Sequence, residues 1–277
     1  MKNIWIKLIQ NMQFKFLQPF YLLLLKVVLW LMNYGIGWST FWNWEIKTLK
    51  LVNGYLRKVK NPIIFDVWAN IWQYINDNIM TASTVYCFEP QSHAFQQFLE
   101  NIPSNTLHTI YPINVWLGDI EGVLDIYSEL DPQDDVDNSC ASIMSDNITN
   151  FLSKDLNKES ISIKTIDDFC ESNWINTINF LKIDIEGYEM QCLKWAKKMI
   201  ENGNIDIIQV EHNRCAIASR VFLRDYWDMF ADKYILCRPL SNNKWRYHIE
   251  NYDIYLENFT YINYVFVKKD IYKKYFI

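Results

Sequence analysis

From residue 61 onward, short apolar runs rich in β-branched residues alternate with segments of helical periodicity. This alternation is typical of parallel strands joined by crossover helices that cover both faces of a sheet. We expect strands at residues 63–67, 85–89, 110–115, 161–165, 180–185, 205–211, 234–237 and 261–267, and helices at residues 71–80, 93–101, 188–200 and 219–231. The pattern therefore predicts an α/β fold with a mostly parallel sheet and helices on both faces.

The length of 277 residues suits one large α/β domain and a terminal extension. We expect an N-terminal helical extension over residues 1–60 and one domain over residues 61–277. Residues 128–160 are rich in Asp, Asn and Ser, and they predict a surface insertion over the strand ends. An acidic run is usually solvated, so we predict no metal site at Asp131, Asp134, Asp135 and Asp137.

Residues 14–32 are strongly apolar but are interrupted by Lys15, Gln18, Pro19 and Lys26. A membrane-spanning helix needs about 20 nearly uninterrupted apolar residues, and the segment lacks the small-residue cleavage site of a signal peptide. Two interpretations stay open. The segment is either a helical arm packed on the domain or an interfacial helix that lies on a membrane with lysines at its edge.

Composition excludes some classes of protein. A net charge of −5 and a pI near 5.4 argue against a nucleic-acid partner, which requires a basic surface. The six cysteines are scattered, without a CxxC pair or a histidine at ligand spacing. We interpret them as reduced thiols of a cytoplasmic protein, which is also membrane-associated if the second interpretation of residues 14–32 holds.

The first strand and loop read FDVWANIW, residues 65–72. Asp66 closes this strand, and Glu89 closes the next one, 21 residues beyond Trp68. A spacing of about 20 is typical of a carboxylate that holds the ribose hydroxyls of a nucleotide. The loop does not have the GxGxxG spacing of a dinucleotide site, which disfavours a nicotinamide-dependent oxidoreductase. If Trp68 and Trp72 are replaced by glycine, it reads D-x-G-x-N-x-G.

That first loop is followed in order by three further motifs: FEP at 88–90, TIDDF at 165–169 and LKIDIEGYE at 181–189. As an ordered set, over residues 61–215, they resemble the FkbM family of S-adenosylmethionine-dependent methyltransferases. The resemblance implies a Rossmann-like methyltransferase fold and S-adenosyl-L-methionine as cofactor. It also implies O-methylation of a sugar or polyketide-like hydroxyl, so that the partner is a small-molecule or glycan acceptor.

Five positions are candidates for cofactor binding. Asp66 and Glu89 are expected to hold the nucleoside from two neighbouring strand ends. Asn70 can hydrogen-bond the carboxylate of the cofactor or brace the turn, and position 68, here tryptophan, lies where the loop approaches the ligand. Asp119 is placed to contact the adenine.

The candidate catalytic residues are Asp184, Glu186 and His212. Asp184 is expected to line the reaction centre, where it either holds the amino group of the cofactor or orients the acceptor. Lys182 lies on the same face of the strand and is expected to pair with a carboxylate there. His212 is a candidate general base because histidine titrates near neutrality. Glu186 enters the following helix, so a capping role for it or for Glu189 is the alternative to catalysis.

The chain has only 7 glycines but 12 tryptophans. Trp68, Trp72 and Trp195 lie where the family pattern has glycine, and Trp116 and Trp174 lie in turn contexts. Some bacterial lineages read the UGA codon as glycine, and a translation that reads UGA as tryptophan would give this text. The hypothesis is that several of these residues are glycine in the natural protein. If they are genuine, the alternative is a pseudoenzyme or binding module whose cofactor loop is blocked by indole rings.

Overall fold

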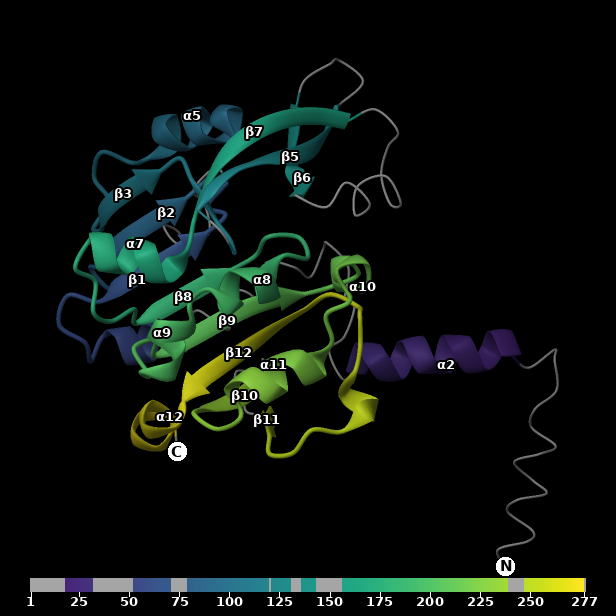
Figure 1. Ribbon diagram of the computed structural model, residues 1–277. Coiled ribbons are helices and arrows are strands. Elements are labelled where there is room, and N and C mark those ends of the chain that lie inside the picture. Colours follow the sequence, from purple (N-terminus) through teal and green to yellow (C-terminus); the bar gives the residue numbers. More distant parts are fainter. Residues whose placement is uncertain are drawn as a thin grey trace, which may run out of the picture.

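The computed structural model describes residues 18–31, 52–70, 79–119, 121–130, 136–142, 156–238 and 247–276. An eight-stranded sheet forms its centre, with strand order β11-β10-β12-β9-β8-β1-β2-β3 (Figure 1). The five parallel strands are β1 (Ile63–Val67), β2 (Thr84–Phe88), β3 (Thr109–Ile113), β8 (Phe180–Ile183) and β9 (Ile207–His212). Three antiparallel strands complete the sheet: β10 (Tyr234–Arg238), β11 (Tyr247–Ile249) and β12 (Ile262–Lys268). The predicted α/β class is confirmed.

The central strands β8 and β9 are buried on both faces, as parallel strands covered by helices are, and this burial includes Lys182 and the polar residues of β9. Alternate residues of β1 enter different cores: Phe65 packs in one cluster and Ile64 in the other. The first cluster includes residues of α7 (Ile166–Ser172), α8 (Glu189–Lys194), α9 (Lys197–Glu201) and α11 (Leu223–Phe230). The second includes residues of the helical segment 52–56, α5 (Ser92–Asn101) and α12 (Lys269–Tyr275).

A second sheet has the order β4-β7-β5-β6 and comprises β4 (Trp116–Leu117), β5 (Gly122–Leu130), β6 (Val136–Ser142) and β7 (Leu156–Lys164). It projects from the β3 side of the molecule (Figure 1). The predicted strand at 161–165 is therefore the end of β7 and does not belong to the central sheet. Its alternation of buried and exposed residues fits a sheet covered on one face only. The described parts of the predicted insertion at 128–160 are strands of this second sheet.

Several boundaries differ from the sequence expectations. The predicted helix at 188–200 is divided into α8 and α9 at Trp195 and Ala196, and the predicted helix at 219–231 is α11, preceded by α10 (Cys215–Ser219). Most of the predicted helix at 71–80 lies outside the described residues, as do Trp72, Asp131, Asp134 and Asp135.

The N-terminal segment contains α2 (Gln18–Leu31), which extends away from the sheet (Figure 1). Its large apolar side chains are largely exposed, Leu23 to 59% and Phe20 to 58%. Within the described part of the chain, none of the helices has the length and apolarity needed to cross a bilayer.

Candidate functional site

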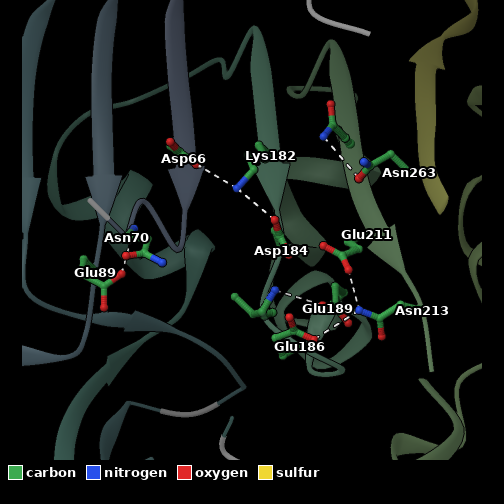
Figure 2. Close-up of polar contacts among 12 residues, drawn as sticks. Asp66, Asn70, Glu89, Lys182, Asp184, Glu186, Glu189, Glu211, Asn213 and Asn263 are labelled. Carbon is green, nitrogen blue, oxygen red and sulfur yellow. Dashed lines mark hydrogen bonds and ion pairs between the residues drawn. The ribbon is translucent and has the colours of Figure 1, made fainter. Parts of the chain in front are cut away.

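The carboxyl ends of β1, β2, β8 and β9 meet at one edge of the central sheet, where polar side chains converge (Figure 2). Strand β1 has β2 on one side and β8 on the other, so the order of strands reverses between β1 and β8. In open α/β sheets this switch point is where ligands bind.

Lys182 connects the two sides of this switch point. It lies directly opposite Asp66 in the β1–β8 register, and its Nζ is 3.5 Å from Asp66 Oδ1 and 3.3 Å from Asp184 Oδ2. The side chains of Lys182 and Asp66 are 5% and 1% exposed, whereas that of Asp184 is 23% exposed. The expected pairing of Lys182 with Asp184 is confirmed, and Asp184 is the member of this chain that solvent reaches.

Three acids form what we call the acidic cluster: Asp184, Glu186 and Glu211, with carboxylate oxygens all within 4.8 Å of one another. Asn213 Nδ2 donates a hydrogen bond to Glu211 Oε1 and a second, of 3.2 Å, to Glu186 Oε2. The Cys215 thiol also lies 3.2 Å from Glu186 Oε2. The cluster is therefore held together by donors from the segment that follows β9 (Figure 2).

The three acids of the cluster differ in the direction of their pKa shifts. Burial opposes the charge of Asp184, but the Lys182 ammonium and the hydrogen bond from Glu211 outweigh it and hold the pKa of Asp184 below its ordinary value. Burial and the neighbouring Asp184 carboxylate raise the pKa of Glu186, and the same two causes raise the pKa of Glu211 strongly. A carboxylate whose charge is favoured thus lies beside two acids whose charged forms are disfavoured, which is the arrangement expected for like charges in close contact.

Glu189 organises the loop between β8 and α8. Its carboxylate accepts hydrogen bonds from the backbone N–H groups of Ile185 and Gly187, at 3.0 and 3.1 Å. In the described part of the chain, helix α8 has no side-chain cap hydrogen bond at its N-terminus, so Glu189 braces the preceding loop and the capping role considered for Glu186 or Glu189 is not found. Since the same loop carries Glu186 at a positive φ of 49°, the Glu189 contacts fix where Glu186 points.

Glu89 joins the first loop to the end of β2. Its oxygens accept hydrogen bonds from Asn70 N at 2.9 Å and from Gln91 N at 3.0 Å. The side chain is fully buried, and burial raises the pKa of Glu89 to about 8 against these two hydrogen bonds. Asp66 contributes to the raised value, so the two acids expected to act together do lie within electrostatic reach. Asn70 braces this turn through its backbone, with φ of 46°.

His212 does not meet the expectation for a general base. It is 1% exposed, and its ring packs against Tyr226, Phe259 and Tyr264, on the side of β9 away from Glu211. Burial lowers the pKa of His212 to about 4, so the prediction that it titrates near neutrality is wrong. Neither ring nitrogen has a hydrogen-bond partner among the described residues.

Trp68, Trp116 and Tyr188 form what we call the aromatic cluster at the same end of the sheet. The Trp116 ring lies 5.4 Å from that of Trp68 and 6.1 Å from that of Tyr188, in edge-to-face geometry. Trp68 is 6% exposed and adopts a φ of +72°, which is a strained region for any residue with a Cβ. Its backbone N–H donates to Phe88 O at 2.9 Å, so the turn is fixed by β2. Asp119 follows β4 and hydrogen-bonds Tyr188, which places it beside this cluster.

The other tryptophans at glycine-like positions differ among themselves. Trp174 has a φ of +53° and is 88% exposed. Trp195 has an ordinary φ of −105°, and Trp116 is buried in β4. Positive φ therefore supports the glycine hypothesis at positions 68 and 174, and backbone geometry does not require glycine at position 195.

The acidic cluster is also the one group in the described residues with the donor set of a metal site. Carboxylates suit hard divalent cations. However, Asn213 directs its N–H groups at the acids, because its Oδ1 accepts a 2.7 Å hydrogen bond from Cys215 N. A hydrogen-bond donor in that place satisfies the oxygens that a cation would need, so we assign no metal to this cluster.

The sequence predicts Glu211 at a strand end, as it does Asp184 and Glu186, but it gave no role to Glu211 and did not identify Asn213 as a partner of these acids. Both residues follow the apolar run of β9, next to His212 in the printed sequence. The period of two in a strand was the available signal, because Glu211 and His212 must face opposite sides. The sequence did not show which face of β9 points toward Asp184 and Glu186.

A model of the methyltransferase FkbM domain matches residues 58–232. The hexuronic acid methyltransferase AglP of Haloferax volcanii is 26% identical over 174 residues, which are 60% of this chain and 65% of that protein. The match thus spans slightly less than two thirds of the relative. Similar solved structures include a precorrin-6y C5,15-methyltransferase of Geobacter metallireducens (8% identity, 80% of this chain, 65% of that chain, TM-score 0.38). Another is TrmK of M. capricolum with S-adenosyl-homocysteine (13%, 80%, 68%, 0.33). With TM-scores under 0.5, neither structure carries a conclusion.

Proposed function

Because the chain belongs to the FkbM family of methyltransferase domains, we propose that it transfers a methyl group from S-adenosyl-L-methionine to a hydroxyl of a sugar-type acceptor. The observation that carries the proposal is the acidic cluster beside the switch point of the sheet, which places an Asp184 of lowered pKa next to two acids of raised pKa. An uncharged hydroxyl is a poor nucleophile and needs an aligned acceptor for its proton.

The polar groups at the strand ends suit a cationic nucleoside. When bound, the cofactor supplies an electrophilic methyl group on a positively charged sulfur. Both Asp66 oxygens are buried without a hydrogen-bond donor among the described residues, although Lys182 lies 3.5 Å away. Each of the two Glu89 oxygens accepts one backbone hydrogen bond, from Asn70 or Gln91, which leaves acceptor capacity for ribose hydroxyls. We assign cofactor binding to Asp66, Glu89 and Asn70, with Asp119 on the adenine side.

The acceptor roles go to Asp184 and Glu186, the two members of the acidic cluster that are only partly buried. Asp184, kept ionised by Lys182, accepts the hydrogen bond of the acceptor hydroxyl and fixes the position of its oxygen. As the methyl group is transferred, the proton passes from the hydroxyl through Asp184 to Glu186, which must be ionised to receive it and whose raised pKa makes it a stronger base than an ordinary carboxylate. Glu211, which is 5% exposed, holds its proton behind them and allows the two outer acids to lie close together.

Calorimetry with S-adenosyl-homocysteine on the full chain tests cofactor binding. Methyl transfer from labelled S-adenosylmethionine to glucuronic acid glycosides, with the matching glucosides as control, then tests the acceptor class. Transfer to the hexuronic acid alone supports the acid sugar that the relative's name suggests. Binding without transfer to either set rejects the sugar acceptor and leaves the methyltransferase assignment intact.

The activity of Glu186→Gln as a function of pH tests the assignment of the base. In the parent protein, the rate should rise with pH as Glu186 loses its proton. The variant should lose this limb of the profile while its affinity for S-adenosyl-homocysteine is unchanged. An unchanged profile would assign the proton to another group.

A second candidate function is a cofactor-free binding module, and Trp68 is the observation that favours it. Its indole is buried against Trp116 at the end of the first loop, where a ligand must approach the backbone. No binding of S-adenosyl-homocysteine to the chain as written, with binding restored in Trp68→Gly, would show that this residue alone blocks an otherwise intact site. No binding in either protein would support the module.

A further inference from the structure

Helix α2 has an apolar sequence and an exposed surface, a combination that is rare in soluble proteins. It reads QPFYLLLLKVVLWL, and seven of its large apolar side chains are 41–59% exposed: Phe20, Leu22, Leu23, Leu24, Leu25, Val27 and Val28. Of residues 19–28, only Tyr21 is partly buried, and the others are exposed. The packed-arm interpretation requires a buried face on this helix, and the described side chains do not provide one.

The distribution of these side chains limits what can cover them. Successive residues of an α-helix are 100° apart, so the exposed positions from 20 to 28 surround the whole helix. A folded domain or a second copy of the chain covers one stripe of a helix. Lipid acyl chains can cover most of its circumference, because they adapt to the shape of the inserted surface.

The charge of the chain indicates which surface attracts this helix. The first 50 residues hold six lysines and one glutamate, a net charge of +5, while the whole chain carries −5, so the remaining 227 residues carry −10. Lys26 is exposed on α2 itself, and the helix contains no acidic residue. A basic apolar segment on an acidic domain is drawn to anionic lipid, whereas the domain is repelled from it.

The length of α2 fits insertion into one leaflet. Its 14 residues span about 21 Å, less than the roughly 30 Å of a hydrocarbon core. We propose that α2 anchors the protein to the surface of an anionic lipid bilayer, with its leucines among the acyl chains and Lys26 at the headgroups. The inference does not depend on the proposed methyl transfer, because it rests on the exposure and charge of the N-terminal segment alone.

Co-sedimentation of the full chain with vesicles tests the anchor. We expect binding to vesicles of phosphatidylcholine with 30% phosphatidylglycerol, and weaker binding to phosphatidylcholine alone. The double variant Leu22→Asp, Leu25→Asp should bind at least tenfold more weakly, because two exposed leucines no longer enter the lipid. Lys26→Gln should weaken binding about fivefold on the anionic vesicles and very little on the neutral ones.

The matched control is Val123→Asp, Ile254→Asp, which places two acids on apolar side chains that are 67% and 71% exposed elsewhere on the domain. This variant should bind the anionic vesicles as the parent protein does, and circular dichroism should show that both double variants keep the folded domain. Equal loss in both double variants would reject α2 as the anchor. A parent protein that stays in the supernatant with every vesicle, or that forms dimers by light scattering without binding lipid, would overturn the proposal.

Discussion

The acidic cluster and the aromatic cluster lie at the same end of the central sheet, but they differ in how well their residues fit the backbone. In the acidic cluster, the carboxyl groups have suitable partners. Asn213 and Cys215 provide hydrogen-bond donors, and a lysine pairs with Asp184. In the aromatic cluster, Trp68 sits at φ +72° and the Trp116 Nε1–H is buried without a partner among the described residues. The difference indicates that the acidic cluster, to which proton transfer is assigned, has matched partners. The backbone strain lies in the aromatic cluster, on the part of the sheet edge assigned to the cofactor.

The largest expected effect comes from the acidic cluster. Asp184→Asn keeps the size of the side chain but removes the charge that orients the acceptor hydroxyl, and we expect the rate of methyl transfer to fall by about 10²–10⁴. Lys182 keeps Asp66 as a partner at 3.5 Å, so the fold should persist. The measurement is a single-turnover rate, with urea unfolding to check the fold.

Asp228→Asn is the matched control for that variant. Asp228 forms an exposed ion pair with Arg224 at 2.9 Å on α11, and its loss should leave the rate unchanged. If Asp184→Asn is as active as this control, the acidic cluster has only a structural role. Proton transfer can then no longer be assigned to this part of the sheet edge.

The next effect distinguishes the two faces of β9. Folded His212 has a pKa of about 4, below the value near 6.5 of an unfolded histidine, so the unfolded chain binds the extra proton between these pH values. The free energy of unfolding should therefore rise by about 3 kcal/mol from pH 4 to pH 6.5 because of His212. His212→Phe should remove this rise and leave methyl transfer at pH 7.5 nearly unchanged.

Urea unfolding curves at pH 4.5 and pH 7 provide the comparison, with His93→Phe as control because His93 is exposed on α5. A His212→Phe protein that loses activity more than tenfold, while it remains folded, would return His212 to the proposed catalytic residues.

A third effect concerns the aromatic cluster. Trp68→Gly removes the Cβ from a positive-φ turn and the indole from the cofactor side of the edge, so affinity for S-adenosyl-homocysteine should rise at least tenfold. The unliganded protein should become less stable, because the buried indole packs on Trp116. Calorimetry at a low temperature, at which both unliganded proteins are folded, measures the change in affinity separately from the change in stability. Equal affinities in the two proteins would mean that the indole lies clear of the ligand.

The sequence predicted the central strands and most of the edge, because both depend on local patterns. Asp66, Glu89 and Asp184 close apolar runs, and parallel strands bring such ends together. The alternation of Gln209 and Glu211 with Val210 and His212 shows that His212 lies on the other face of β9 from Glu211, but because both faces are buried the sequence does not show which face meets the site. The second sheet was missed because polar residues of β5 and β7 pair with each other, and that pairing is not local.

The smallest expected effect tests whether positive φ alone identifies misplaced tryptophans. Trp174 is 88% exposed at φ +53°, so Trp174→Gly relieves about 1–2 kcal/mol of backbone strain and loses little packing. After the entropy of glycine in the unfolded chain is subtracted, we expect the free energy of unfolding to rise by about 0.5 kcal/mol. Trp195→Gly, at φ −105°, relieves no such strain and should lower it by about 0.5–1 kcal/mol. Urea midpoints measure both changes. If the two substitutions change the free energy of unfolding in opposite directions, glycine stabilises the protein only where φ is positive, and the strain at position 68 then comes from its backbone. If both changes have the same sign, Trp68 is an ordinary core residue.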